Sequence, residues 1–533
     1  MSVRYDAIVV GGGHNGLVCA AYLGRAGMRV LVLERAARVG GALASDTLVP
    51  GARVPAYAHT VGRLAPAVAR DLGLAGHGLR LVQPAVRASG LVPGAPPLVL
   101  WGDPGRTAAG LRARSAADAD AWPGADAEVR GFAAVLGRLA HLTPPDPGAL
   151  ALGDLPGILR TGLALRDLGA RDAGELLRVL AQPVADFLED RFALPELRAL
   201  LAVRGMRWSA LGPADPGTTH LLLADAAGHA GGLAGETVYV RGGPGALADA
   251  LAAAARAAGV TIRTGAPVAR FRSDGERLTG VILADGEEIA GARVVSGLDP
   301  RTTLLDLTDP ELLGPRGGWE AGNLPVRGVT GKVNLALAAL PEVAGASGED
   351  AARILRGRLV VAPPLRAMEH ALRAVRSGAL PDAPWCEATI PSLVDPLLVD
   401  GADAAGVRHV MSIVVQPVPA AADPAALADR VLATLEPVLP GLGTRVVARS
   451  VETPATLAHA LGIAGGHPVH LEPGLDRWFA WRPGLGMARY RLPVPGLWLC
   501  ASGAHPGGGV TGLPGRNAAR EIVAAHRADG ESA

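Results

Sequence analysis

The stretch YDAIVVGGGHNG at residues 5–16 joins an apolar strand to a glycine turn, and a helical pattern and the strand VLVLE at residues 30–34 follow it. Gly11 and Gly13 have no side chain, so backbone N–H groups there can approach a pyrophosphate at the helix N-terminus. Gly16 lets the helix pack close to the sheet, and Glu34 can accept hydrogen bonds from both ribose hydroxyls. This order of elements predicts a Rossmann-like α/β domain that binds a dinucleotide.

Two further stretches of sequence indicate which dinucleotide the domain binds. RAARVGG at residues 35–41 directly follows Glu34, and HPGGGVTGLPGRNAA at residues 505–519 lies near the end of the chain. The spacing from Glu34 to Gly40-Gly41 resembles the flavin-binding doublet of the amine oxidase and phytoene desaturase superfamily, and the C-terminal stretch is similar to the second flavin motif of that superfamily. The resemblance implies noncovalent FAD.

The likeness covers nearly the whole chain. YVRGG at residues 239–243 and GGHPVH at residues 465–470 look like the branch that holds the pyridine nucleotide-disulfide oxidoreductase domain-containing protein 2 and the carotenoid ketolases. The motifs and the resemblance together predict FAD contacts at Gly11, Gly13, Asn15, Gly16, Glu34, Arg35, Arg38, Gly40, Gly41, Val268, Gly503, Gly507, Gly508, Gly509 and Val510.

The length of 533 residues exceeds that of one ordinary domain. We expect an α/β fold in which a discontinuous FAD-binding domain (residues 1–75, 236–300 and 485–533) adjoins a mixed α+β substrate domain (residues 76–235 and 301–484). GGPG at residues 242–245 opens a helix that would return the chain to the FAD sheet. A second nucleotide site there is the weaker alternative, because the GxGxxG spacing and a ribose-binding acid are missing.

Composition excludes several classes of protein. The net charge of +1 gives no sign of nucleic-acid or acidic-substrate binding. No stretch approaches ~18 apolar residues, and the first strand leaves no room for a signal peptide, so we expect a cytoplasmic protein or one attached to a membrane surface. The three cysteines, Cys19, Cys386 and Cys500, form no CxxC motif, so neither a disulfide framework nor a redox dithiol is indicated.

The stretch from Leu152 to Val179 carries Leu and Ile between Arg160, Arg166 and Arg171. This pattern favours an ordinary amphipathic surface helix, and a membrane-contacting face through which a lipophilic substrate enters is the alternative.

Lys332, in GKVNLAL at residues 331–337, is the only lysine of the chain. A lysine at the start of a similar strand holds a water against flavin N5 in the amine oxidase superfamily, and Lys332 looks like its equivalent. An ammonium on a flexible stem can bind one water as a compact point charge. We therefore predict a catalytic role for Lys332, against the alternative of a stray lysine without function.

The C-terminal glycine loop precedes a helix, whose N-terminus suits the flavin edge that becomes negative on reduction. His505 lies in this loop and is a second catalytic candidate, although a packing role is the stronger interpretation. The loop lacks the acid that many superfamily members carry, because Gly503 and Ala504 stand there, and Ala42 replaces an arginine that is common in amine oxidases. Both departures weaken the interpretation as an amine oxidase.

Phe, Trp and Tyr make up only 3% of all residues, yet Trp478, Phe479 and Trp481 stand close together near His467 and His470. Trp478, Trp481 and His470 are predicted to line the substrate cavity, with plain core packing as the alternative. No metal is expected, because His467 and His470 have no third ligand at a recognisable spacing.

These patterns predict an FAD-dependent oxidoreductase of the desaturase, oxidase or ketolase type that acts on an apolar, carotenoid- or isoprenoid-like small molecule. The alternatives are an oxidase of amines or of another small polar metabolite, and a flavin-binding protein with a structural or regulatory role. The expected binding partner is a lipophilic small-molecule substrate and not a nucleic acid. Peripheral contact with a membrane and formation of a homodimer are further possibilities. The sequence leaves the electron acceptor and the choice between net oxidation and isomerisation undecided.

Overall fold

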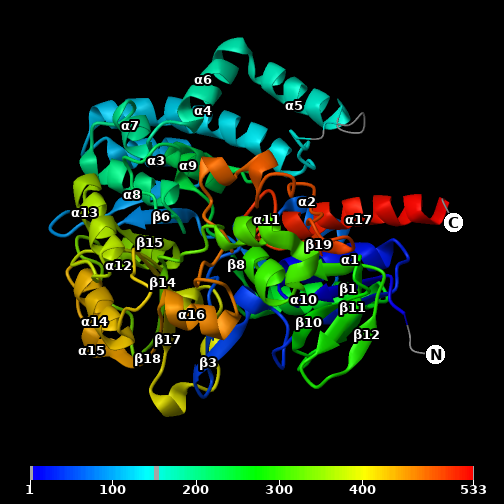
Figure 1. Cartoon of the computed structure of the whole chain (residues 1–533). Coiled ribbons are helices and arrows are strands. Elements are labelled where there is room, and N and C mark those ends of the chain that lie inside the picture. Colours follow the sequence, from blue (N-terminus) through cyan, green and yellow to red (C-terminus); the bar gives the residue numbers. More distant parts are fainter. Residues whose placement is uncertain (1–3, 149, 151–154, 532–533) are drawn as a thin grey trace.

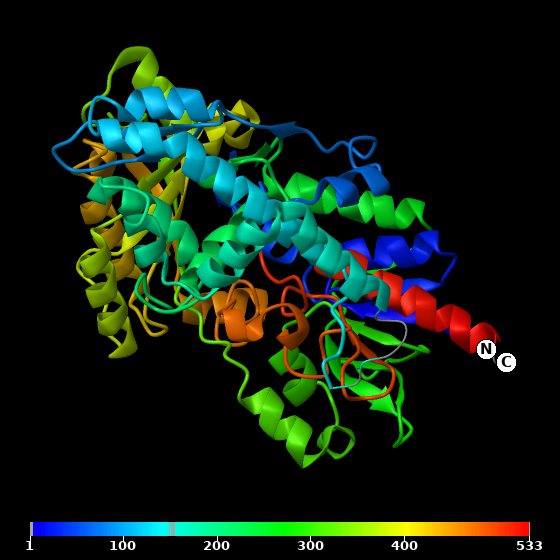
Figure 2. The same cartoon turned by 90° about the horizontal axis from the view of Figure 1, so that it is seen from above.

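The computed structural model of the protein describes residues 4–148, 150 and 155–531. Figure 1 shows one lobe around the first strand and both chain ends, and a second lobe that carries most of the middle of the chain. In Figure 2 the two chain ends lie at the same side of the molecule.

The first lobe contains a five-stranded parallel sheet of order β19-β13-β1-β2-β9. Its strands are β1 (Ala7–Val10), β2 (Val30–Leu33), β9 (Thr261–Arg263), β13 (Val294–Ser296) and β19 (Leu497–Leu499). Both faces of the sheet are covered, so β1 and β2 are buried at every position. The prediction of an α/β fold with a Rossmann-like sheet is confirmed.

Three helices pack against this sheet: α1 (His14–Arg25), α10 (Pro244–Ala257) and α17 (Leu513–Glu531) (Figure 1). A Cβ at Gly515 would lie 2.2 Å from the Asn15 carbonyl oxygen, so α1 and α17 touch backbone to backbone. The segment at residues 242–245 opens α10, and β9 after it pairs with β2. It is therefore a crossover back to the same sheet.

Smaller elements complete this lobe. Residues 268–290 form the antiparallel meander β10 (Val268–Ser273), β11 (Leu278–Leu283) and β12 (Glu288–Ala290). The other small elements are α2 (Pro66–Asp71), η4 (Thr302–Asp306) and α11 (Pro310–Gly322). The short strands β5 (Leu81–Val82) and β8 (Tyr239–Val240) form an antiparallel pair of their own.

The second lobe is built on a seven-stranded sheet of order β18-β14-β17-β16-β15-β6-β7. Its strands are β6 (Val86–Gly90), β7 (Leu98–Trp101), β14 (Gly331–Leu337), β15 (Arg358–Val361), β16 (Trp385–Thr389), β17 (His409–Gln416) and β18 (Val446–Glu452). All neighbours are antiparallel except β15 and β6. The hairpin β3 (Ser45–Val49) and β4 (Ala52–Pro55) packs its Ala52 and Val54 against this sheet.

One register row of this sheet is important for the site. Glu452, Lys332, Val414 and Glu387 are direct partners on the successive strands β18, β14, β17 and β16. Residues directly opposite each other in antiparallel strands point to the same face. The row therefore places a lysine between two carboxylates on one face of the sheet.

The second lobe also carries helices, some of which contact the seven-stranded sheet directly while others pack on those helices (Figure 1). They are α3 (Pro104–Leu111), α4 (Ala116–Ala140), α5 (Leu155–Leu168), α6 (Ala170–Leu180), α7 (Val184–Glu189), α8 (Pro195–Gly205), α9 (Thr218–Ala226), α12 (Gly348–Arg356), α13 (Leu365–Arg376), α14 (Pro424–Leu435), α15 (Leu442–Arg445) and α16 (Pro454–Leu461). Buried Trp122 and Phe187 belong to the core that α4, α7, α8 and α9 share.

Helix α5 stands out from the body of the lobe (Figure 1). Leu155, Ile158, Leu159 and Leu163 on this helix are exposed, and Leu159 is 64% exposed. Residues 152–154 of the predicted amphipathic stretch lie outside the described residues. No helix among the described residues is long and apolar enough to cross a membrane.

Candidate functional site

A cavity of about 690 Å³ lies where β1, β2 and β13 end, and we call it the outer cavity. Ligands of open parallel sheets bind at this edge. Eight of the predicted FAD contacts line it: Gly11, Gly13, Asn15, Glu34, Arg35, Arg38, Gly41 and Val268. His470, predicted for the substrate cavity, lines the outer cavity instead of the inner one described below.

Glu34 is fixed at the end of β2 by two backbone donors. Gly12 N donates to Oε2 at 2.8 Å, and Ala36 N donates to Oε1 at 2.9 Å. Each carboxylate oxygen keeps a second lone pair for a ligand hydroxyl. A Cβ at Gly13 would meet nothing within 4 Å, so the backbone faces open space where a pyrophosphate would approach.

Three of the predicted glycines serve packing. A Cβ at Gly16 would lie 2.2 Å from the Gly11 carbonyl oxygen, and one at Gly503 would lie 2.6 Å from Pro300 Cδ. Gly40 has a φ of 131° and donates its N–H to the Gly12 carbonyl oxygen at 2.9 Å. These three are not among the residues that line the outer cavity.

A smaller cavity of about 90 Å³, the inner cavity, continues from the outer one. The two cavities share His14, Ala42, Pro468 and Ser502 as lining residues. Gly509 and Val510 of the C-terminal glycine loop line the inner cavity, whereas Gly507 and Gly508 line a neighbouring space. The loop therefore lies next to the junction of the two main cavities.

Lys332 itself is not among the lining residues of either cavity, but its register row runs from one cavity to the other. Its neighbour Glu452 lines the outer cavity, and Val414 and Glu387 in the same row line the inner one. The Lys332 side chain is fully buried, and Nζ donates to Ser412 Oγ at 2.6 Å. Burial lowers the pKa of Lys332 to about 7, although Glu387 opposes the shift. Lys332 can therefore hold or release a proton near neutral pH.

The lowered pKa of Lys332 predicts a pH-dependent stability. Between pH 7 and 10.5 the unfolded chain binds a proton that the folded chain lacks, so stability rises with pH in this window. The free energy of unfolding of the wild type should gain up to about 1.4 kcal/mol per pH unit relative to Lys332→Met. Urea unfolding of both proteins at pH 7.5 and 9 measures the gain; parallel pH dependences would contradict the prediction.

His505 is fully buried and lies outside the lining of both cavities. Its Nε2 lies 3.1 Å from the Leu139 carbonyl oxygen, and its ring meets the edge of Phe479 at 5.3 Å. Burial is the main cause that lowers its pKa to about 3. This geometry favours a packing role, and nothing in it supports proton transfer by His505.

Trp478 and Trp481, the two tryptophans predicted for the substrate cavity, lie in different surroundings. Trp478 lies against His220 at 4.9 Å and lines the space next to the inner cavity. Trp481 is 49% exposed and is not among the lining residues of either main cavity. Arg482, by contrast, is buried and donates to the Ser502 carbonyl oxygen at 2.9 Å, which anchors the glycine loop.

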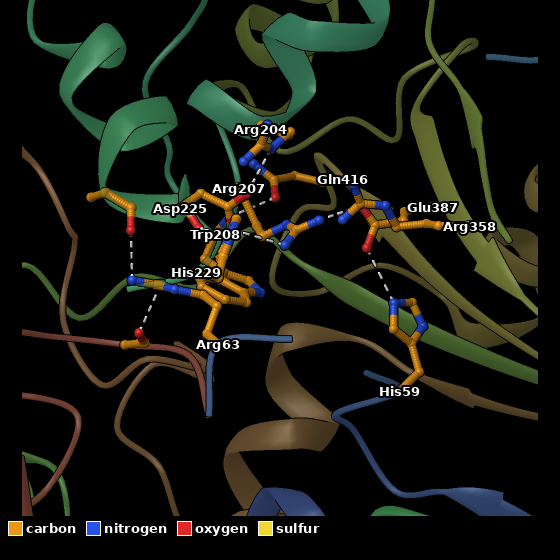
Figure 3. A network of polar contacts seen from close by, with 12 residues as sticks. His59, Arg63, Arg204, Arg207, Trp208, Asp225, His229, Arg358, Glu387 and Gln416 are labelled. Atoms are coloured by element: carbon orange, nitrogen blue, oxygen red, sulfur yellow. Dashed lines mark hydrogen bonds and ion pairs between the residues drawn. The ribbon is translucent and has the colours of Figure 1, made fainter. Parts of the chain in front are cut away.

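A network of buried charges beside the inner cavity was not predicted from the sequence (Figure 3). Arg207 binds Glu387 at 2.5 Å and Asp225 at 3.1 Å, and the three residues lie on different elements. Gln416 donates to the carbonyl oxygens of Met206 and Ser209, at 2.6 and 2.8 Å, and so fixes the turn that carries Arg207.

The fold also brings two of the cysteines together. Cys19 on α1 and Cys500 after β19 are buried, and the Cys19 thiol interacts with Cys500. Burial, followed by Cys500, raises the pKa of the Cys19 thiol well above its usual range. Both sulfurs are free, and the shift keeps Cys19 protonated.

The residues present fit FAD. The polar atoms His14 Nε2, Asn15 Oδ1 and His470 Nδ1 are buried at the outer cavity and have no hydrogen-bond partner in the described part of the chain. Glycine backbone, the ordered Glu34 and these unpaired groups match a ligand with a pyrophosphate, a ribose and a polar ring system. When bound, FAD supplies two-electron chemistry. Fold and site thus define an FAD-dependent oxidoreductase.

Comparison with known protein families also indicates a flavin-dependent oxidoreductase. Residues 16–339 match the family model described as flavin containing amine oxidoreductase. The chain belongs to this family, and the cofactor prediction is confirmed.

Three relatives illustrate the range of the similarity. The pyridine nucleotide-disulfide oxidoreductase domain-containing protein 2 of Rattus norvegicus is 32% identical over 97% of this chain and 93% of its own. One limonene dehydrogenase subunit, from Castellaniella defragrans, is 39% identical over 117 residues, 22% of this chain and 21% of its own. A putrescine oxidase bound to putrescine shares the fold, with a TM-score of 0.59 and 17% identity over 99% of this chain and 100% of its own.

Proposed function

We propose that this protein oxidises or desaturates an apolar, isoprenoid-like molecule in the inner cavity, with FAD as the electron acceptor. The observation that carries the proposal is the junction of the two cavities. There a fully buried lysine with a pKa of about 7 lies in the register row that runs from the FAD cavity to the inner cavity. A reaction that passes electrons to a cofactor and a proton to the protein needs such an arrangement.

Two observations support an isoprenoid carbon skeleton. Val203, Trp385, Val414 and Val469 contribute apolar surface to the inner cavity. The partial relative from Castellaniella defragrans is named for limonene, which is an isoprenoid hydrocarbon.

The charges beside the inner cavity disfavour an amine. A protonated amine needs an unpaired carboxylate or an aromatic cage. Both carboxylates of the network, Asp225 and Glu387, are already shared by arginines, and Glu236, the third carboxylate that lines the inner cavity, pairs with Arg87 at 3.8 Å. Two residues of the chain have clear tasks in the proposed reaction. Lys332 Nζ accepts the proton that the substrate loses or passes it on. Ser412 Oγ accepts a hydrogen bond from Nζ and so orients the amine.

The visible spectrum of the holoprotein under anaerobic conditions tests the proposal. We expect isoprenoid hydrocarbons or polyenes to bleach the oxidised FAD bands, and we expect putrescine and cyclohexylamine to leave them unchanged. Bleaching by the amines alone would replace the proposal with an amine oxidase. An oxidised flavin that no compound reduces would favour a structural or regulatory role.

Peripheral membrane contact through α5, a homodimer and a cytoplasmic location also belong to the proposal. The exposed Leu155, Ile158, Leu159 and Leu163 support the membrane contact. Flotation with lipid vesicles, sedimentation and cell fractionation test these points; failure of the protein to float with vesicles would remove α5 as the entry route.

A further inference from the structure

The network beside the inner cavity consists of four arginines and two carboxylates, and we call it the arginine cluster. Its members come from distant parts of the chain, which Figure 3 shows converging: Arg63, Arg204, Arg207, Asp225, Arg358 and Glu387. Arg63 lies in the loop after β4, Arg204 and Arg207 at the end of α8, and Asp225 on α9. Arg358 and Glu387 lie on the neighbouring strands β15 and β16.

Each carboxylate of the cluster is shared by two guanidinium groups. Asp225 binds Arg204 at 2.7 Å and Arg207 at 3.1 Å. Glu387 binds Arg207 at 2.5 Å and Arg358 at 3.5 Å, and it also lies 3.2 Å from His59 Nε2. Burial alone would raise the pKa of each carboxyl, but these arginines hold both pKa values well below the usual range.

Arg63 has no carboxylate partner among the contacts of the described residues. Its Nη1 donates to the Gly508 carbonyl oxygen at 2.9 Å, and its Nη2 donates to the Ala224 carbonyl oxygen at 2.7 Å. Burial lowers the pKa of Arg63 and outweighs the opposing effect of Asp225. The charge of Arg63 is therefore buried without a full counterion.

The cluster carries two positive charges more than negative ones, because four guanidinium groups face two carboxylates. The other titratable groups nearby do not remove this excess. Burial lowers the pKa of His59 to about 4 and that of His229 to about 3, so both are neutral at pH 7. Glu236 is paired with Arg87 at 3.8 Å, and Lys332 can only add positive charge.

Three donors of the cluster have no hydrogen-bond partner in the described part of the chain: Arg63 Nε, Arg204 Nη2 and Arg358 Nε. Buried donors of native proteins are nearly always satisfied, and an unpaired donor costs free energy. Excess charge and unused donors together indicate a missing anion at this place.

Three of the arginines reach open space. Arg63 and Arg207 line both the inner cavity and the small space next to it, and Arg204 lines the small space. Three carboxylates, Asp225, Glu236 and Glu387, line the inner cavity as well, whereas Asp225 is the one carboxylate among the residues that line the small space.

We propose that the substrate of the inner cavity carries a carboxylate group, which Arg63 and Arg207 bind where the inner cavity meets the small space. This inference rests on the proposed function and refines its substrate to an apolar skeleton with an acidic end. A carboxylate matches the planar guanidinium fork, and it fits the small cavity better than a pyrophosphate.

Binding of small probes to the holoprotein tests the inference without turnover. Octanoate, octanamide and octylamine share one chain and differ in the charge of the head group. Octanoate should raise the thermal unfolding midpoint and perturb the visible bands of bound FAD, with an affinity at least about 10-fold above that of octanamide, and octylamine should have the lowest affinity. Equal binding of octanoate and octanamide would overturn the inference.

A pair of variants locates the site. Arg63→Gln removes the charge that has no carboxylate partner and retains an amide donor for the Gly508 or Ala224 carbonyl oxygen. Arg293→Gln is the matched control, because Arg293 is also buried but pairs with Asp529 and His526 at the opposite lobe. The preference for octanoate over octanamide should disappear in Arg63→Gln and persist in Arg293→Gln. An unchanged preference in Arg63→Gln would overturn the inference.

The wild-type comparison of the three probes keeps the inference testable if Arg63→Gln does not fold. Failure of the inference is also distinct from failure of the proposed function. Neutral isoprenoids that bleach FAD, together with equal binding of octanoate and octanamide, would leave the oxidoreductase proposal intact and remove the acidic end. Selective octanoate binding without bleaching by any isoprenoid would support the anion site and remove the proposed oxidation of isoprenoids.

Discussion

Glu387→Ala is expected to lower the free energy of unfolding by about 3–5 kcal/mol, because it removes one partner of a buried ion network. The substitution leaves Arg358 without a carboxylate and Arg207 with Asp225 alone. It also raises the excess charge of the arginine cluster from two to three. Urea unfolding at pH 7.5, followed by circular dichroism, measures the loss.

Glu349→Ala is the matched control for this prediction. Glu349 also pairs with an arginine, Arg353, but its side chain is 84% exposed, and such pairs contribute little. Glu387→Gln should recover part of the lost stability, because the amide oxygen still accepts hydrogen bonds. If Glu387→Ala and Glu349→Ala have equal effects, the cluster does not stabilise the fold electrostatically.

Lys332→Met is expected to slow bleaching of the FAD bands by on the order of 10²-fold while the protein retains its FAD. The proton-handling Nζ is lost, but Met fills a similar volume and leaves no buried charge behind. The protein should therefore remain folded. Anaerobic stopped-flow spectroscopy of bleaching, together with the flavin to protein absorbance ratio, separates catalysis from cofactor binding.

Ser412→Ala controls for the orientation of the lysine. It removes the acceptor at 2.6 Å and retains the amine, so its bleaching rate should lie between those of the wild type and Lys332→Met. Unchanged bleaching and reoxidation rates in Lys332→Met would leave the buried lysine without a role in the reaction.

Part of the lining of the outer cavity could be predicted from the sequence because it follows from local backbone rules. A glycine turn between a buried strand and a helix permits few arrangements, and Glu34 follows at the end of the next strand. Gly11, Gly13, Asn15 and Glu34 accordingly line the outer cavity. The domain boundaries at residues 75, 236, 300 and 485 stay a prediction.

The arginine cluster could not be predicted in the same way. Its residues are far apart in the sequence, and an arginine carries little information in a chain where all basic residues except one lysine and the histidines are arginine. A net charge of +1 also conceals a local excess, because exposed pairs such as Arg353 and Glu349 cancel in the total. Glu387 lies inside the strand WCEAT, which is buried at every position. A buried carboxylate needs a charged partner, so this residue could have indicated the cluster.

The prediction that the clustered aromatic residues line the substrate cavity stays a prediction. Clustering in sequence does not fix direction, and Trp478 and Trp481 are only three residues apart yet differ in surroundings. Trp478 packs beside His220, whereas Trp481 faces solvent on one side. A short 3-10 turn, η9 (Phe479–Trp481), turns the chain between them.

The parallel sheet of the first lobe has a consequence for protein synthesis. β1 pairs early with β2, but its other neighbour, β13, is translated almost three hundred residues later, and β13 waits about two hundred further residues for β19. The glycine loop and α17 are translated last. Ser502, which lines the outer cavity, also follows β19, so this cavity is complete only when translation is nearly finished. Chains that end before β19 would thus lack an edge strand of this sheet and part of the lining of the outer cavity.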